Sequence, residues 1–249
     1  MTDVAHTRRT YDTHGQEYHE KRQSPRRNFW NLFIDTPAMA ALLKRVVRGK
    51  RVLDAGCGSG IFTGKLKTWD AKVTGCDLSK TLVEIARREH PDIPFLVCDA
   101  QKTPFKTGSF DIVSSNLLLH YFKDPTPFLR EMRRVLRPGG RLIFSFHHPF
   151  NEGVTKIKIG NKTGYDLTAS CTPYFHNKQY TWTMISGTME MISYHHTFEH
   201  VATALHKAGF VIELIKEPRP APKTRKYGPK HYDRTTRYPS FCVIQARKD

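Results

Sequence analysis

Short apolar runs alternate with amphipathic stretches through the middle of this 249-residue chain. The apolar runs predict strands near residues 51–55, 72–76, 94–97, 110–115 and 140–146. Apolar positions at helical spacing predict helices near 60–67, 79–89 and 126–136. Strands that alternate with helices form a parallel sheet with helices on both faces. Residues 50–146 are therefore expected to form an α/β core.

The segments on either side follow other patterns. Residues 1–49 read as mainly helical, and Gly49 ends a helix that begins near residue 38. Residues 147–197 interrupt the alternation, with strand candidates at 180–185 and 188–193, and insertions of this length usually serve as lids or binding loops. The remainder predicts a helix near 197–208 and strands near 210–215 and 241–246. We expect one domain with four parts: a helical cap (1–49), the core (50–146), a lid insertion (147–197) and a closing helix with two strands (198–249).

A glycine turn follows the first predicted strand, in the sequence R-V-L-D-A-G-C-G-S-G. Gly56, Gly58 and Gly60 stand at every second position, where glycine lets the backbone approach a ligand closely. A dinucleotide fingerprint has the spacing G-x-G-x-x-G and rests a pyrophosphate on the next helix. Here the third glycine comes one residue early, and Asp54 precedes the turn. An acid at this place would repel a phosphate and suits a ligand that carries a positive group.

Two further acids follow predicted strands. Asp77 ends the second strand, 17 residues after Gly60, where a carboxylate can accept hydrogen bonds from both ribose hydroxyls. The alternative role, capping the next helix, is better filled by Ser79. Asp99 follows the third strand.

Five motifs together resemble those of the class I S-adenosylmethionine-dependent methyltransferases. They are the glycine turn, V-T-G-C-D-L-S, V-C-D-A, F-D-I-V-S-S-N-L-L-L-H and V-L-R-P-G-G, in that order over about residues 50–146. The stretch Y-D-T-H-G-Q-E-Y, which starts at Tyr11, resembles the opening Y-D-x-x-A-x-x-Y segment of small-molecule methyltransferases. The resemblance is closest to bacterial enzymes of the ubiquinone/menaquinone-methyltransferase type. It implies a Rossmann-like, seven-stranded, mostly parallel sheet with helices on both faces, a helical N-terminal cap and a lid insertion after strand five.

The resemblance also implies S-adenosyl-L-methionine as cofactor, a ligand with an ammonium and a sulfonium group but no phosphate. In such a site Asp77 binds the ribose, Asp99 reaches the adenine amino group, and the aromatic residues of the opening segment close over the ligand. The implied cofactor-binding residues are Tyr11, Tyr18, Asp54, Gly56, Cys57, Gly58, Gly60, Asp77, Leu78, Asp99, Ala100, Asn116 and Leu117.

The methyl acceptor should lie outside the carboxyl ends of the fourth and fifth strands. His147 and His148 emerge there, and an imidazole of near-neutral pKa could remove a proton from a hydroxyl or a protonated amine. The alternative is that either histidine only orients the loop before Pro149. Methyl transfer is an in-line displacement, so positioning alone can supply much of the acceleration. The candidate acceptor-binding residues are His120, Tyr121, Phe150, Tyr180, Trp182 and His195.

The formal net charge of +17 fits nucleic-acid binding, an anionic substrate or a generally basic surface. An RNA or DNA methyltransferase is the less favoured reading, because no separate nucleic-acid-binding domain is visible. In addition, the Asn/Asp-Pro-Pro-aromatic motif of base amino-group methylation does not follow the fourth strand. A second alternative is a non-catalytic partner protein that binds the cofactor. The favoured function is methyl transfer to nitrogen or oxygen of a small, aromatic or anionic molecule.

The remaining patterns narrow the class of protein. Five scattered cysteines without a C-x-x-C motif predict reduced thiols and no zinc site. Asp124 is the one carboxylate near the predicted acceptor site, so no metal is expected there. No apolar run is long enough to span a membrane, and no secretory signal is visible. A cytoplasmic location is expected.

Overall fold

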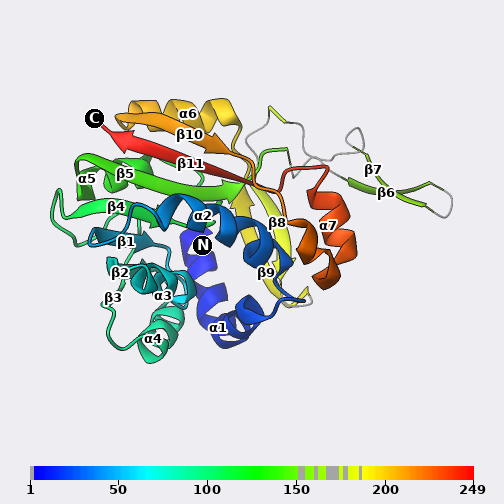
Figure 1. The fold of residues 1–249 in the computed structure, drawn as a ribbon, viewed down its shortest axis with the longest axis horizontal. Coiled ribbons are helices and arrows are strands. Elements are labelled where there is room, and N and C mark those ends of the chain that lie inside the picture. The colour runs from blue at the N-terminus through cyan, green and yellow to red at the C-terminus, as the bar shows by residue number, and fades with distance from the viewer. Residues whose placement is uncertain (1–2, 151–154, 160–161, 167–173, 176–178, 185–186) are drawn as a thin grey trace.

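A seven-stranded sheet forms the centre of the computed structural model (Figure 1). The structure describes residues 3–150, 155–159, 162–166, 174–175, 179–184 and 187–249, without the side chains of 3, 155–159 and 162–166. The strand order is β10-β11-β5-β4-β1-β2-β3, and only β11 runs antiparallel to its neighbours within this sheet. The strands are β1 (Arg51–Ala55), β2 (Lys72–Asp77), β3 (Phe95–Val97), β4 (Phe110–Ser115), β5 (Leu136–His147), β10 (Phe210–Lys216) and β11 (Phe241–Lys248). The predicted mostly parallel sheet is confirmed.

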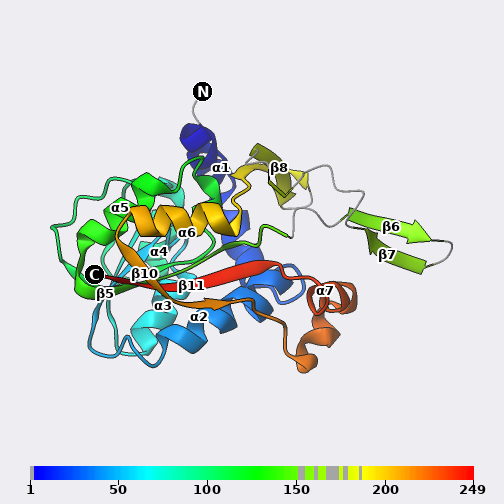
Figure 2. The same ribbon diagram turned by 90° about the horizontal axis from the view of Figure 1, so that it is seen from above.

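Helices cover both faces of the sheet (Figure 2). On one face lie α2 (Thr36–Leu43), α3 (Ile61–Thr68) and α4 (Lys80–Glu89), and on the other lie α5 (Thr126–Val135) and α6 (Phe198–Lys207). Because successive strand residues point to opposite faces, Val52 packs with the first group of helices and Leu53 with the second. The sheet is therefore buried on both faces, as parallel sheets are.

Polar contacts dock the N-terminal helix α1 (Asp3–Gln23) against the core. The Asp12 carboxylate accepts hydrogen bonds from the Ser79 hydroxyl at 2.7 Å and the Thr81 N–H at 3.2 Å. His19 Nδ1 lies 2.9 Å from the Ser59 hydroxyl in the glycine turn. A Cβ at Gly15 would lie 2.7 Å from Thr81 Cγ2, so glycine allows the close approach of α1 to α4. These contacts hold α1 over the carboxyl ends of β1 and β2.

Two antiparallel hairpins lie in the described part of the insertion after β5. β6 (Thr155–Ile159) and β7 (Lys162–Asp166) form one hairpin, which projects away from the sheet in both views (Figures 1 and 2). β8 (Gln179–Met184) and β9 (Met189–Tyr194) form the other, within one residue of the predicted positions at each end. This second hairpin packs its Met189 and Met191 against tyrosines of α1.

Three short helical segments complete the same end of the molecule: one lies in the N-terminal region predicted to be mainly helical, and two lie in the proline-rich segment, where no helix was predicted. A short π-helical turn, η1 (Asn31–Asp35), precedes α2, and α7 (Pro229–Thr235) follows a 3-10 segment, η5 (Pro222–Tyr227). Phe33 of η1 stacks on Tyr227 with ring centroids 4.8 Å apart. A single 3-10 turn, η2 (Leu119–Tyr121), follows β4. In the part of the chain that the structure describes, no helix combines the length and apolarity that crossing a bilayer requires.

Gly60 fixes the start of α3, and its substitution should be costly. Its φ is +80°, and a Cβ would lie 3.0 Å from the Ala86 Cβ. Gly49 is a matched control, because its φ is +69° but nothing lies within 4 Å of the Cβ position. We expect Gly49→Ala to lower the free energy of unfolding by about 1–2 kcal/mol through backbone strain alone. Gly60→Ala should cost at least ~1 kcal/mol more through crowding. Equal losses in urea unfolding would contradict the role given to the Ala86 contact.

Candidate functional site

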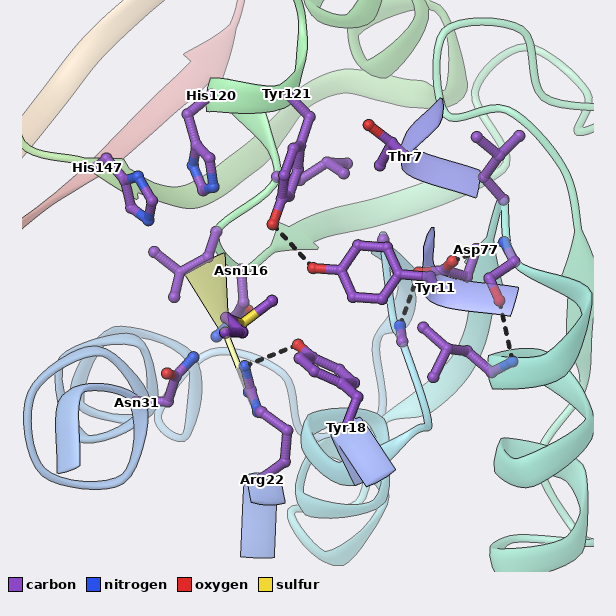
Figure 3. A pocket seen from close by; sticks show the side chains of 18 of the residues that line it. Thr7, Tyr11, Tyr18, Arg22, Asn31, Asp77, Asn116, His120, Tyr121 and His147 are labelled. Atoms are coloured by element: carbon purple, nitrogen blue, oxygen red, sulfur yellow. Dashed lines mark hydrogen bonds between the residues drawn. The ribbon is translucent and has the colours of Figure 1, made fainter. Parts of the chain in front are cut away.

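A cavity of about 470 Å³ opens at the carboxyl ends of the parallel strands. Its walls come from α1, the glycine turn, the residues after β2, β3 and β4, the end of β5, strand β8 and α7. Figure 3 shows side chains from α1, η1 and the ends of the strands converging on it. The predicted site residues that line it are Tyr11, Tyr18, Gly56, Gly58, Asp77, Leu78, Asp99, Ala100, Asn116, Leu117, His120, Tyr121, His147, Tyr180 and Trp182.

The glycine turn folds back onto the end of β2. The N–H groups of Gly56 and Cys57 donate to the Cys76 carbonyl at 2.8 and 3.0 Å. Gly58 has a φ of +54°, and nothing lies within 4 Å of the position where a Cβ would stand. The turn thus presents bare backbone to the cavity at Gly58. Gly60 lies outside the lining, so its part is to begin α3 and not to contact the ligand.

Asp77 is oriented by this turn. Its Oδ2 accepts a hydrogen bond from the Gly58 N–H at 2.8 Å, and its Oδ1 accepts one from the Ser79 N–H at 2.9 Å. Burial raises the pKa of Asp77, and these N–H donors oppose that shift. A carboxylate has about four lone-pair sites, so the backbone donors leave accepting capacity for a hydroxyl in the cavity. Asp99 lines the same end of the cavity, and its Oδ1 accepts from the Gln101 N–H at 2.8 Å.

Asp54 lies in a smaller recess that adjoins the cavity. The recess includes Cys57 and shares Gly56, Gly58, Asn116, Tyr18 and Arg22 with the main cavity. The Asp54 carboxylate is 1% exposed and accepts a hydrogen bond from the Thr63 hydroxyl at 2.7 Å. Burial raises its pKa to about 6, against the opposing effect of the hydrogen bonds from Thr63 and Ser114. A cation in the recess would stabilise the ionised form of this carboxyl group.

Three tyrosines roof the cavity. The hydroxyls of Tyr11 and Tyr121 lie 2.8 Å apart, and the ring centroids of Tyr11 and Tyr18 lie 5.1 Å apart in an edge-to-face arrangement (Figure 3). Arg22 Nη1 donates to the Tyr18 hydroxyl at 3.2 Å. Arg22 was not among the predicted site residues, although helical periodicity places Tyr11, Tyr18 and Arg22 on one face of α1.

Two stacked imidazoles form another wall. The rings of His120 and His147 lie 3.7 Å apart at an interplanar angle of 9°. His147 Nδ1 lies 2.8 Å from the Tyr180 hydroxyl, and Trp182 meets the His147 ring edge-on at 5.3 Å. Burial lowers the pKa of His147 to about 4 and holds that of His120 well below its usual range. Both rings are therefore neutral at pH 7.

Asp35 is a further buried acid that the sequence did not single out. It is 0% exposed in η1, and its Oδ2 accepts a hydrogen bond from Asn116 Nδ2 at 3.3 Å. Burial raises its pKa, and among the described atoms its Oδ1 has no hydrogen-bond partner. Asn116 Oδ1 in turn accepts from the Ser114 hydroxyl at 3.2 Å. The Asn116 amide, which lines both cavity and recess, is thus fixed from two sides.

Besides Gly60, and Asp54 and Cys57 of the recess, three predicted residues lie outside the lining of the cavity: His148, Phe150 and His195. His148 Nε2 lies 2.9 Å from the Glu217 carboxylate, and its Nδ1 accepts from the Phe150 N–H at 3.1 Å. Both ring nitrogens of His148 are thereby engaged in holding the chain after β5. His195 Nε2 lies 2.8 Å from the Tyr174 carbonyl. Within the described residues, no group of three or more His, Cys, Asp or Glu side chains is arranged to hold a metal ion.

Comparison with known proteins agrees with this geometry. Residues 53–144 match the family model described as a methyltransferase domain. A solved S-adenosylmethionine-dependent methyltransferase from Mesorhizobium loti is 28% identical and superposes with a TM-score of 0.74, over 85% of this chain and 96% of that one. The chain carries a class I S-adenosylmethionine-dependent methyltransferase domain. The predicted Rossmann-like fold and S-adenosylmethionine as cofactor are confirmed.

Curated relatives match over the core of the domain. Demethylmenaquinone methyltransferase of Beutenbergia cavernae is 40% identical over 95 residues, which are 38% of this chain and 40% of that protein. Malonyl-[acyl-carrier protein] O-methyltransferase of Erwinia pyrifoliae is also 40% identical over 95 residues, 38% of this chain and 36% of that protein. The chain thus spans less than half the length of these relatives. Their names describe different acceptors, although both align through the same domain.

The raised pKa of Asp54 predicts a pH-dependent stability. The folded protein favours the protonated carboxyl group of Asp54. The contribution of this group to the free energy of unfolding is therefore fully present below about pH 4 and is lost as the pH rises through about 6. A shift from 3.8 to about 6 corresponds to roughly 3 kcal/mol. Asp54→Asn, which can still accept the Thr63 hydrogen bond, should therefore be the more stable protein above pH 6, by up to that amount.

Urea unfolding of both proteins between pH 4 and 8 would measure this difference. The difference in the free energy of unfolding should vanish toward pH 4. The effects of other titrating groups cancel, because both proteins contain these groups. A stability difference that does not change with pH would contradict the buried, destabilised carboxylate.

Proposed function

We propose that this chain is an enzyme that transfers the methyl group of S-adenosylmethionine to nitrogen or oxygen of a small molecule. One observation carries the proposal. One cavity joins Asp77 at the end of β2 and Asp99 after β3 to the His147 wall, so a cofactor and an acceptor can occupy adjoining parts of it. When bound, the cofactor supplies an electrophilic methyl group on a sulfonium with a good leaving group.

The residues at the cofactor end match the parts of this ligand. Asp77 has lone pairs available for the ribose hydroxyls, and Asp99 is placed for the adenine amino group. The recess suits the amino-acid end of the ligand, because Asp54 can face an ammonium and Arg22 a carboxylate. An ammonium near Asp54 would favour its ionised form and offset the cost of its burial. The open backbone at Gly58 leaves room for the ligand to pass between the two ends.

The remaining walls exclude water and set the direction of approach. Tyr11, Tyr18 and Tyr121 cover the cofactor end, and Trp182 of the second hairpin covers the acceptor end. Holding acceptor and methyl in line within a dry space supplies acceleration without a strong acid or base. Asn116, fixed by Ser114 and Asp35, lies where the cofactor end meets the acceptor end.

His147 is the residue best placed to accept a proton from the acceptor. It lines the cavity, is neutral at pH 7, and is oriented through Nδ1 by Tyr180. His148 was predicted for the same role, but its ring nitrogens are engaged by Glu217 and Phe150 outside the cavity. The proposal therefore assigns proton acceptance to His147 and a structural role to His148.

Cofactor binding is the first test. S-adenosylhomocysteine, which keeps the ribose and adenine, should raise the melting temperature, whereas NADH should not, because ligand that binds only the folded state stabilises it. Asp77→Asn should weaken S-adenosylhomocysteine binding at least about tenfold, through weaker charge-assisted hydrogen bonds. Asp92→Asn, an exposed acid outside the cavity, is the control and should bind as the unchanged protein does. A stabilisation by NADH instead would sink the proposal.

Measurement of enzyme turnover tests the role of His147 as proton acceptor. With tritiated S-adenosylmethionine and a panel of hydroxy- and aminobenzoates, His147→Gln should lower kcat by about 10²–10⁴ if the imidazole accepts the proton during transfer. His148→Gln is the matched control, with kcat expected within a few-fold of the parent. Because the pKa of His147 is about 4, kcat at saturating cofactor should show no loss from this group down to about pH 5. Equal effects of the two substitutions would leave His147 without the assigned role.

A further inference from the structure

Positive side chains gather in the wall of the cavity. Arg8, Lys21, Arg22, Arg27 and Arg234 all line it, whereas its two lining acids, Asp77 and Asp99, are at the cofactor end. Lys21 is partly buried, and burial together with the neighbouring Arg27 and Arg22 lowers its pKa. Like charges held this close repel one another in the absence of a ligand. Such an arrangement destabilises the protein unless an anion enters the space between the charges.

The carboxylates nearby offset this charge only in part. Glu17 lies 3.5 Å from Arg27 and is also the acid that raises the pKa of Lys21, so one carboxylate faces both cations. Asp12 lies 3.7 Å from Arg8 but also accepts hydrogen bonds from α4. The Arg234 guanidinium lies 5.3 Å from the centre of the Trp30 ring, a contact that orients its side chain. Among the described residues that line the cavity, cations outnumber acids by five to two.

The cations divide into two groups by position. Arg22 borders both the cavity and the Asp54 recess, so the proposed cofactor carboxylate accounts for it. Lys21, Arg27 and Arg234 line only the main cavity. They come from the end of α1, the following loop and α7, together with Trp30 and Asn31. In Figure 3, Asn31 lies across the drawn cavity from His120 and Tyr121. Because Lys21, Arg27 and Arg234 do not border the Asp54 recess, the cofactor carboxylate does not account for them, which leaves them for the acceptor.

We propose that the methyl acceptor carries an anionic oxygen group, a carboxylate or phosphate, that Lys21, Arg27 and Arg234 bind. The inference rests on the proposed methyltransferase function and specifies its substrate class. Guanidinium groups bind such oxygens through paired hydrogen bonds, which fix orientation as well as position. An acceptor anchored at this wall directs its opposite end toward the cofactor, which is the alignment that an in-line displacement needs.

Binding of small probes to the full chain saturated with S-adenosylhomocysteine tests this assignment. Calorimetry would compare 4-hydroxybenzoate and phenyl phosphate with the neutral 4-hydroxybenzamide. We expect at least one anion to bind about tenfold or more tightly than the amide, as charge-assisted hydrogen bonds predict. Whichever of the two anions binds more tightly identifies the site as one for a carboxylate or one for a phosphate.

Two variants and two controls locate the effect. Lys21→Met and Arg234→Gln should each weaken binding of the preferred anion about five- to tenfold and leave the amide and S-adenosylhomocysteine unchanged. Lys223→Met and Arg219→Gln alter exposed cations close in sequence to Arg234 that do not line the cavity, and should have no effect. Lys21→Met should also raise the melting temperature without ligand, because it relieves repulsion, whereas Lys223→Met should not.

The outcomes separate this inference from the proposed function. If S-adenosylhomocysteine binds but neither anion is preferred, the anionic acceptor is overturned while cofactor binding stands. Equal weakening by the cavity variants and by the surface controls would attribute the preference to general surface charge and also overturn the assignment. Failure of S-adenosylhomocysteine to bind the unchanged protein would instead remove the proposed function itself.

Discussion

The hydrogen bond from the Gly58 N–H to the Asp77 carboxylate is the constraint on which the site depends. It forms only if the turn after β1 folds back onto the end of β2, which requires the positive φ of Gly56 and Gly58. The same turn starts α3 at Gly60 and presents Ser59 to His19 of α1. Orientation of Asp77, the start of α3 and docking of the N-terminal helix thus share one local backbone geometry. The backbone conformation that a ligand contacts is therefore already formed before the ligand binds.

The sequence pattern was sufficient for the core and for the strand-end acids. Strands buried on both faces leave strong apolar runs, so β1, β2, β4 and the helices between them were predicted within a few residues. Asp77 and Asp99 could be predicted because parallel strands bring their carboxyl ends to one edge of a sheet. By contrast, α1 docks through Asp12, Gly15 and His19, and such polar contacts leave little hydrophobic periodicity to detect.

Other site residues depend on long-range packing. Asp35 reaches Asn116 from a π-helical turn far away in the sequence, and no local pattern marks a buried acid of that kind. His147 and His148 are neighbours at the end of β5, and successive residues of an extended chain point to opposite sides. Only one of them could face the cavity, and the pairing of β5 with β4 and β11 decides which. The hairpin of β6 and β7 and helix α7 lie in polar or proline-rich segments with weak periodic signals.

The cavity is formed partly by the aligned methyltransferase domain and partly by segments outside it. The aligned methyltransferase domain supplies the glycine turn, Asp77, Asp99 and Asn116. The second hairpin, α7 and the end of α1 lie outside residues 53–144 and supply Tyr180, Arg234 and Lys21. Because these walls are separate chain segments, they can change in sequence without disturbing the sheet.

The polar docking of α1 has a consequence for the working cycle of the protein. Hydrogen bonds to Ser59, Ser79 and Thr81 hold the helix over the cofactor end, while the sheet is stabilised by deeply buried apolar side chains. We expect that detaching α1, which also separates Tyr11 and Tyr18 from Met189 and Met191, costs less free energy than unfolding the core, as for a local opening unit. Such an opening would expose one end of the cavity while the glycine turn and Asp77 stay assembled.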